Sequence, residues 1–141
     1  MFSGPRSTSR LSGAALTTAI VGLTLTTAYI HFSLGGVLFT LNALGYLALA
    51  AALVVGAAAP HPLIDRFSWL PRVGLAGYTL VTIGAYLVMG PYFSLGWVAK
   101  AVEVAIVTLL AVDVIRVYGS PMGLIRAALA SLPGSARTRP A

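Results

Sequence analysis

The sequence predicts an all-α membrane protein, an up-down bundle of four transmembrane helices with a short C-terminal interfacial amphipathic helix. Of its 141 residues, 58% are hydrophobic and only 9% are charged, whereas soluble domains carry about 25% charged residues. Apolar runs of about 20 residues, the length that crosses a bilayer, alternate with short polar or glycine-containing turns. Arginine is confined to alternate turns. These three observations together place most of the chain in lipid.

The first predicted elements are a flexible N-terminus, residues 1–10, and a span over residues 11–32. The apolar run is longer than the roughly 7–15 residues of a signal peptide, so we expect a retained helix. Cleavage after Ala28 is the alternative. Five threonines lie in this span, and their hydroxyl groups can bond carbonyl oxygens one turn back, which makes them tolerable in lipid.

The second span covers residues 37–59 and ends at Pro60. Small residues recur along it at steps of three and four, which predicts a face that a neighbouring helix can approach closely. This stripe consists of Gly45, Ala48, Ala52, Gly56 and Ala59.

The third span covers residues 73–89 and the fourth residues 95–118, so the transmembrane domain is predicted over residues 11–118. The fourth span differs from the others because it contains charged residues, which are costly in a bilayer and are usually paired or functional. These are Lys100, Glu103, Asp113 and Arg116. We expect Asp113 and Arg116 to form a structural pair.

Residues 119–141 form the predicted C-terminal region on the cytoplasmic side. Ser120 as N-cap and Pro121 at the first helical position indicate a helix over residues 121–132. The helix is too short to span a membrane and presents one apolar face, which favours a position at the interface. That face is formed by Met122, Ile125, Leu129 and Leu132. A basic tail follows.

The arginines predict the orientation. With four spans, all eight fall on the same side of the membrane: Arg6, Arg10, Arg66, Arg72, Arg116, Arg126, Arg137 and Arg139. We expect the protein in the cytoplasmic membrane, and the positive-inside rule then places both termini in the cytoplasm. Because this pattern explains the net charge of +6, we expect the lipid bilayer as partner and no nucleic acid.

A short internal repeat relates the two halves of the chain. Phe32–Gly35 recurs as Phe93–Gly96, each copy in the turn between two predicted spans. The repeat makes Asn42 and Glu103 equivalent positions, which leads us to expect their side chains within reach of one another.

Six polar or aromatic residues fall in the outer half of the predicted membrane, and they form the candidate ligand or proton site. They are Glu103, Lys100, Asn42, His31, Tyr46 and Tyr86. One interpretation is a pocket or proton-handling site open to the outside. The alternative is a structural ion pair, with the Lys100 side chain extending outward to the headgroups.

The sequence predicts no cofactor, no metal and no enzyme activity. It has no cysteine, and it shows no nucleophile–base pair and no phosphate-binding glycine loop. The two histidines, His31 and His61, flank the second span and therefore lie at opposite membrane faces, where they cannot share a haem.

Residues 31–50 (HFSLGGVLFTLNALGYLALA) and 96–110 (GWVAKAVEVAIVTLL) resemble small, uncharacterised four-helix integral membrane proteins of bacteria. The resemblance implies the fold and the membrane location, and no activity. The expected function is that of an accessory or interaction subunit, in a homo-oligomer or a larger membrane complex. The alternative is a small transporter or proton-coupled carrier that uses the site around Glu103.

Overall fold

The described part of the protein is all-helical. The computed structural model describes the backbone of residues 6–133 and the side chains of residues 12–133; residues 1–5 and the tail 134–141 lie outside the described part. The helices are α1 (Arg6–Leu34), α2 (Val37–Ala58), α3 (Pro62–Arg66), α4 (Trp69–Met89), α5 (Ser94–Tyr118) and α6 (Pro121–Ser131).

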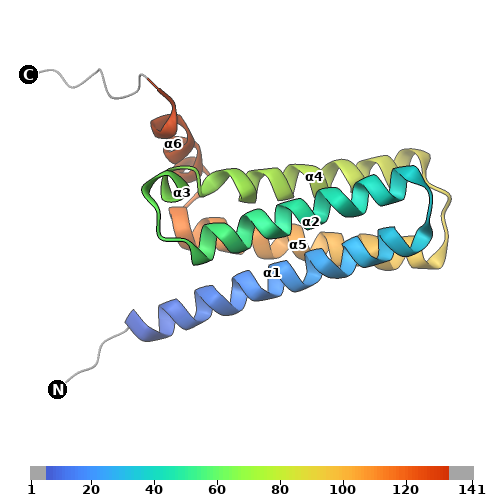
Figure 1. Ribbon diagram of the computed structural model, residues 1–141, viewed down its shortest axis with the longest axis horizontal. Coiled ribbons are helices and arrows are strands. Elements are labelled where there is room, and N and C mark those ends of the chain that lie inside the picture. The colour runs from blue at the N-terminus through green and yellow to red at the C-terminus, as the bar shows by residue number, and fades with distance from the viewer. Residues whose placement is uncertain (1–5, 134–141) are drawn as a thin grey trace, which may run out of the picture.

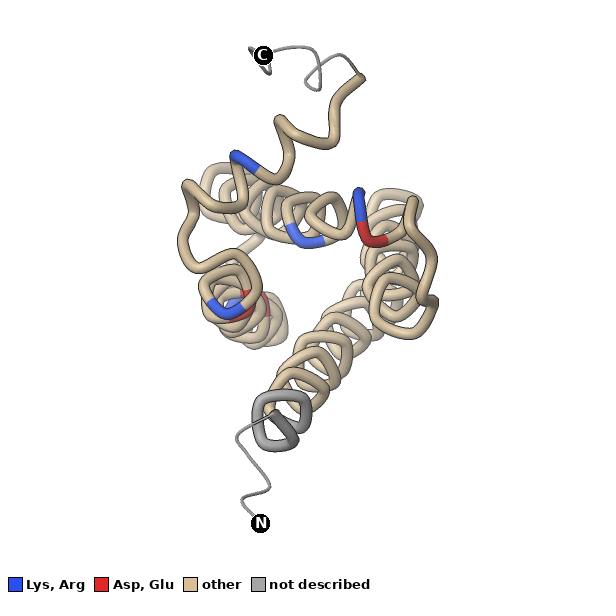
Figure 2. The backbone as a smooth tube through the Cα atoms, turned by 90° about the vertical axis from the view of Figure 1, so that its left-hand side faces the viewer, with Lys and Arg blue, Asp and Glu red and all other residues tan. Residues whose placement is uncertain are grey.

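The four long helices lie side by side, and the chain reverses direction between each of them and the next (Figure 1). Helix α1 packs against α2 and α5, and α4 packs against the same two helices, so α2 and α5 lie on a diagonal of the bundle. The turns at residues 35–36 and 90–93 lie at one end, and α3 and α6 lie at the other. Figure 2 looks along the bundle from the α3–α6 end.

The turn between α1 and α2 is tight because of two glycines. Gly35 and Gly36 have φ angles of 71° and 84°, in the region that residues with a Cβ atom rarely adopt. Two such residues in succession reverse the chain with no further linker. The turn therefore fixes how the end of α1 and the start of α2 meet.

Two helices begin earlier than the sequence predicts. Helix α1 begins at Arg6, inside the segment expected to be flexible, because no proline or glycine interrupts the chain between Pro5 and Leu11. Helix α4 begins at Trp69 instead of residue 73. Pro71 then lies in the first turn. N–H groups there have no acceptor within the helix, so the missing N–H of proline costs no helical hydrogen bond.

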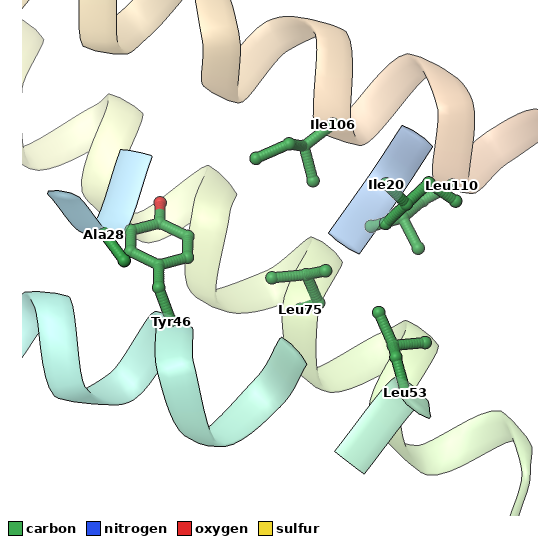
Figure 3. Close-up of a cluster of buried hydrophobic side chains, with 7 residues drawn as sticks. All are labelled: Ile20, Ala28, Tyr46, Leu53, Leu75, Ile106 and Leu110. Atoms are coloured by element: carbon green, nitrogen blue, oxygen red, sulfur yellow. The ribbon is translucent and has the colours of Figure 1, made fainter. Parts of the chain in front are cut away.

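The bundle is apolar outside and partly polar inside. An apolar cluster from all four long helices fills the middle (Figure 3): Ile20, Ala28, Tyr46, Leu53, Leu75, Ile106 and Leu110. Threonine, histidine and charged side chains are also buried: Thr24, Thr27, His31, Thr79, Lys100, Glu103 and Asp113. On the outside, Val37, Val88 and Met89 are about four-fifths exposed (78%, 81% and 77%). Such a surface is suited to lipid.

Three helices are long and apolar enough to cross a membrane: Ser12–Leu34 within α1, Val37–Ala58 and Trp69–Met89. The fourth long helix, α5, has 25 residues and carries four charged side chains, and it is not among the three. Within the described residues, α1, α2 and α4 are thus candidate membrane spans by length and composition, and α5 differs from them by its charged side chains.

The predicted small-residue stripe of α2 is only partly buried. The buried face consists of Ala43, Tyr46, Ala50 and Leu53. Gly45 does permit a close approach, because a methyl group there would collide with the Tyr78 hydroxyl of α4. At Gly56, by contrast, an added methyl group would meet nothing within 4 Å. Of the other members of the stripe, Ala48 is exposed, whereas Ala52 and Ala59 are partly buried.

Helix α6 begins as predicted. The Ser120 hydroxyl accepts a hydrogen bond from the Gly123 N–H group at 3.0 Å, and Pro121 follows it. The helix is fixed to the bundle at its last turn, where Arg66 donates to the Ser131 carbonyl oxygen and the Trp69 indole donates to the Ser131 hydroxyl at 3.1 Å. Its apolar face is half-exposed.

Candidate functional site

Glu103 is a completely buried carboxylate in the interior of the bundle. It belongs to the inward face of α5, whose members follow one another at steps of one, three and four residues: Gly96, Ala99, Lys100, Glu103, Ile106, Leu110 and Asp113. The glutamate side chain is 0% exposed. An ionised carboxylate at such a position needs both a counter-charge and hydrogen-bond donors.

Each carboxylate oxygen of Glu103 has partners from a different helix. Oε1 accepts from the Thr27 hydroxyl of α1 at 3.3 Å and lies 3.7 Å from the His31 Nε2 atom. Oε2 forms an ion pair with the Lys100 ammonium and accepts from the Thr82 hydroxyl of α4 at 3.1 Å. The carboxylate is therefore held by α1, α4 and its own helix.

His31 has a defined orientation. Its Nδ1 atom lies 2.8 Å from the Thr27 carbonyl oxygen, and because a carbonyl only accepts, Nδ1 carries a proton and donates it. The other nitrogen, Nε2, then points at Glu103 without a proton of its own while the ring is neutral. Nε2 and Oε1 thus face each other at 3.7 Å as two acceptor atoms.

Lys100 is inside the bundle, and the prediction that its side chain extends outward is wrong. The residue is 7% exposed. Its ammonium group contacts Glu103, lies 3.4 Å from the Thr82 carbonyl oxygen and stands 5.4 Å from the centre of the Tyr86 ring. A carboxylate, a carbonyl and an aromatic face together attract the ammonium more strongly than the outer surface does.

The remaining predicted residues contribute indirectly. Tyr46 is 0% exposed, and its hydroxyl lies 2.7 Å from the Thr82 hydroxyl, so that it extends the network from α2. Tyr86 supplies the ring beside Lys100, and its own hydroxyl donates to the Phe93 carbonyl. No hydrogen bond from the Asn42 side chain to Glu103 is found in the described part of the chain. The backbone carbonyl oxygen of Asn42 accepts a hydrogen bond from the Tyr78 hydroxyl.

The partners of Glu103 that sequence reasoning missed are Thr27 and Thr82. Threonines in the first span were expected to bond carbonyl oxygens one turn back, as Thr24 and Thr26 do at 2.7 and 2.9 Å. Thr27 instead turns its hydroxyl toward another helix. A usable signal is its spacing of four residues from His31, which places both side chains on one helix face.

A cavity of about 400 Å³ adjoins this network near the turns at residues 35–36 and 90–93. It lies between the end of α1, helices α2 and α4, and the first turns of α5, and its wall is largely apolar. His31, Asn42, Thr82, Tyr86 and Lys100 line it, but Glu103 does not. Lys100 thus separates the glutamate from the cavity.

A second buried carboxylate lies at the other end of α5. Asp113, 2% exposed, accepts from Arg116 at 2.7 Å, as the sequence predicts, and also from Arg72 of α4 at 2.7 Å. Arg72 also donates to the Ser68 carbonyl oxygen at 2.6 Å. The cluster joins the start of α4 to the end of α5.

Within the described residues there is no group of three or more histidine, cysteine or acidic side chains that could hold a metal ion. Comparison of the chain with protein-family models, with curated protein sequences and with solved structures finds no match.

Proposed function

We propose that the chain is a four-span protein of the cytoplasmic membrane with both termini in the cytoplasm. Besides the three apolar helices, α5 has the required length, because 25 residues rise about 37 Å and a bilayer core is about 30 Å thick. Its Lys100, Glu103 and Asp113 side chains are buried against other helices, so they are not exposed to lipid. The loop and helix arginines gather at the α3–α6 end, which supports a cytoplasmic position for that end.

We propose further that this protein is a small, non-catalytic, proton-coupled carrier whose proton site is the His31–Glu103 pair. The observation that carries this proposal is the 3.7 Å separation of Nε2 and Oε1, with the other imidazole nitrogen donating to a backbone carbonyl. A proton arriving at this place changes the charge balance of Lys100 next door. Ionisable chains of this type in membranes mark proton relays and substrate pathways.

A purely structural role explains the network less well. A buried ion pair gives little net stability, because desolvation offsets the attraction, and well-packed apolar residues of similar volume often serve equally well. The Glu103 network also lies beside a cavity of about 400 Å³, within the range of about 300–1,000 Å³ typical of small-molecule sites. A stabilising pair needs no such cavity.

Infrared difference spectroscopy on the reconstituted protein tests the proton site. Between about pH 8 and about pH 5, a band of the protonated Glu103 carboxyl or of the His31 imidazolium should appear in the wild type and be lost in Glu103→Gln. The chain has only three acids, so Asp113→Asn serves as the matched control and should keep the band. A spectrum unchanged by Glu103→Gln would refute the proton site.

An accessory or interaction subunit is the second candidate function. It is favoured by two residues of the α2 stripe, because Ala48 is exposed and Gly56 has open space beside it. Small residues on an unpartnered membrane face allow a helix of another subunit to pack closely. Gly56→Leu should then reduce oligomers or copurifying partners in mild detergent, whereas Val88→Leu on the exposed face of α4 should not.

A further inference from the structure

The cavity beside Lys100 opens on the apolar flank of the bundle. Leu38 and Leu41 of α2 and Val81 and Met89 of α4 line it, and all four side chains are strongly exposed, at 77%, 60%, 69% and 77%. In a membrane this flank faces lipid, so a molecule can enter the cavity sideways, between α2 and α4. Only a molecule that partitions into lipid uses such a route.

The charge offered to the cavity is positive. Lys100 lines it, and no acidic side chain of the described residues does so. The charge that balances Lys100 is Glu103, which is completely buried behind it. An anionic group in the cavity therefore meets a cation and no acid, whereas a cationic group meets repulsion.

We propose that the cavity binds a single-chain amphiphile with an anionic head group, with the chain between α2 and α4 and the head group at Lys100. This ligand proposal rests on the proposed carrier function and specifies the class of molecule carried. The volume of about 400 Å³ matches one small-molecule ligand. Charge complementarity with Lys100 selects an anion over a cation.

Binding is linked to the uptake of one proton. When the ligand anion pairs with Lys100, Glu103 loses its counter-charge and is left as a buried, unbalanced carboxylate. A proton placed between Glu103 Oε1 and His31 Nε2 restores neutrality, so one anion and one proton bind together. The titratable groups that face Glu103 are His31 from α1, Tyr46 from α2, Tyr78 from α4 and Lys100 from α5. Among them only His31 offers a free acceptor for that proton.

Decanesulfonate is a suitable probe because it stays anionic throughout the working pH range. We would measure its binding by calorimetry to the full chain in phosphatidylcholine nanodiscs, with decyltrimethylammonium as the cationic counterpart. We expect sulfonate binding to tighten up to about tenfold for each pH unit between about pH 8 and about pH 6. Glu103→Gln should abolish this pH dependence, and the ammonium compound should show no specific binding.

Two variants locate the site. Lys100→Met should weaken sulfonate binding by about tenfold or more, whereas Lys100→Arg should retain most of it. Ala85 is exposed and lines the cavity, so Ala85→Phe should block the cavity without touching the ion pair. Val88→Phe, on the same helix but outside the cavity, is its matched control. If Lys100→Met fails to fold, the Ala85 and Val88 variants still decide the matter.

The outcomes separate this inference from the proton site. Equal binding of sulfonate and ammonium, or no effect of Ala85→Phe, would overturn the ligand class even if the infrared band of Glu103 is present. Displacement of the sulfonate by phosphatidylglycerol would make the occupant a bilayer lipid and would also overturn it. In liposomes loaded with a pH-sensitive dye, external decanesulfonate should acidify the lumen with the wild type and not with Ala85→Phe.

Discussion

The two buried carboxylates of α5 have similar surroundings but different chemistry. Glu103 has a cation three residues before it and His31 from a second helix; Asp113 has a cation three residues after it and Arg72 from a second helix. Both carboxylates are nearly inaccessible, with side chains 0% and 2% exposed. The two clusters therefore share one geometry: a buried carboxylate between a cation of its own helix and a basic side chain of a second helix.

Their partners behave differently toward protons. Both cations at Asp113 are guanidinium groups, which remain charged at any physiological pH and bind carboxylates in a fixed geometry. At Glu103 the partners are a lysine and a histidine, side-chain types whose charge depends on their surroundings. The arginine cluster is thus a permanently charged structural link between α4 and α5, whereas we propose that the lysine–histidine cluster exchanges protons.

The two clusters are expected to lie toward opposite membrane faces. Cysteine labelling from outside the cell tests this and has the largest expected effect, because each position either reacts or does not. Single cysteines at the exposed positions Ser33 and Ser94 should react with an impermeant thiol reagent added to whole cells. A cysteine at Asp65, exposed on α3, should react only after lysis. The chain has no native cysteine to interfere. The reverse pattern would exchange the inner and outer ends.

Removing the acid of the arginine cluster should cause the largest loss of stability. Asp113→Asn leaves Arg72 and Arg116 facing each other without a counter-charge, and neither can become neutral. We expect a loss of about 3 kcal/mol in the free energy of unfolding, at the lower end for buried pairs because Arg116 is partly exposed. Reversible unfolding in mixed micelles measures it. A loss below about 1 kcal/mol would remove the difference between the clusters.

The same measurement at the other cluster should give a smaller effect. In Glu103→Gln a hydrogen-bond acceptor remains at this position, and Lys100 keeps the Thr82 carbonyl oxygen and the Tyr86 ring as partners, so we expect a loss of about 1 kcal/mol. A double-mutant cycle with Lys100→Met should show weak coupling, below about 1 kcal/mol. If both single changes cost several kcal/mol and the double change recovers most of it, the pair is a permanent structural ion pair, like the one at Asp113.

Much of the fold could be predicted because apolar length and glycine or proline breaks are local properties. The turns at Gly35–Gly36 and Gly90–Pro91, and the Ser120 cap, lie where the residues place them. The start of α4 could not be placed as well, because Pro71 is compatible both with a loop and with the first turn of a helix. The crossing of the membrane by α5 remains a prediction.

The candidate site was less predictable because its contacts join helices far apart in sequence. Glu103, Lys100 and His31 stand out by their charge in an apolar chain, and the structure brings them together. The internal repeat pointed to Asn42 as the partner, but α2 and α5 lie on a diagonal, and Thr27 and Thr82 from the adjacent helices reach the carboxylate first. Threonine is common in membrane helices, so its presence alone does not mark an interhelical contact.

The smallest expected effect concerns α6, which lies at the Asp113 end. Its Ile125 and Leu129 side chains are 49% and 58% exposed, and we expect them to insert into the cytoplasmic interface. Replacing both with aspartate should release the helix from the membrane while Arg66 still holds its last turn. Amide exchange should then accelerate in residues 121–131 only, with the free energy of unfolding changed by less than about 1 kcal/mol. Faster exchange that spreads to Arg72 and Asp113 would mean that α6 helps to stabilise the arginine cluster. The ion pairs of that cluster would then not be sufficient to hold α4 and α5 together.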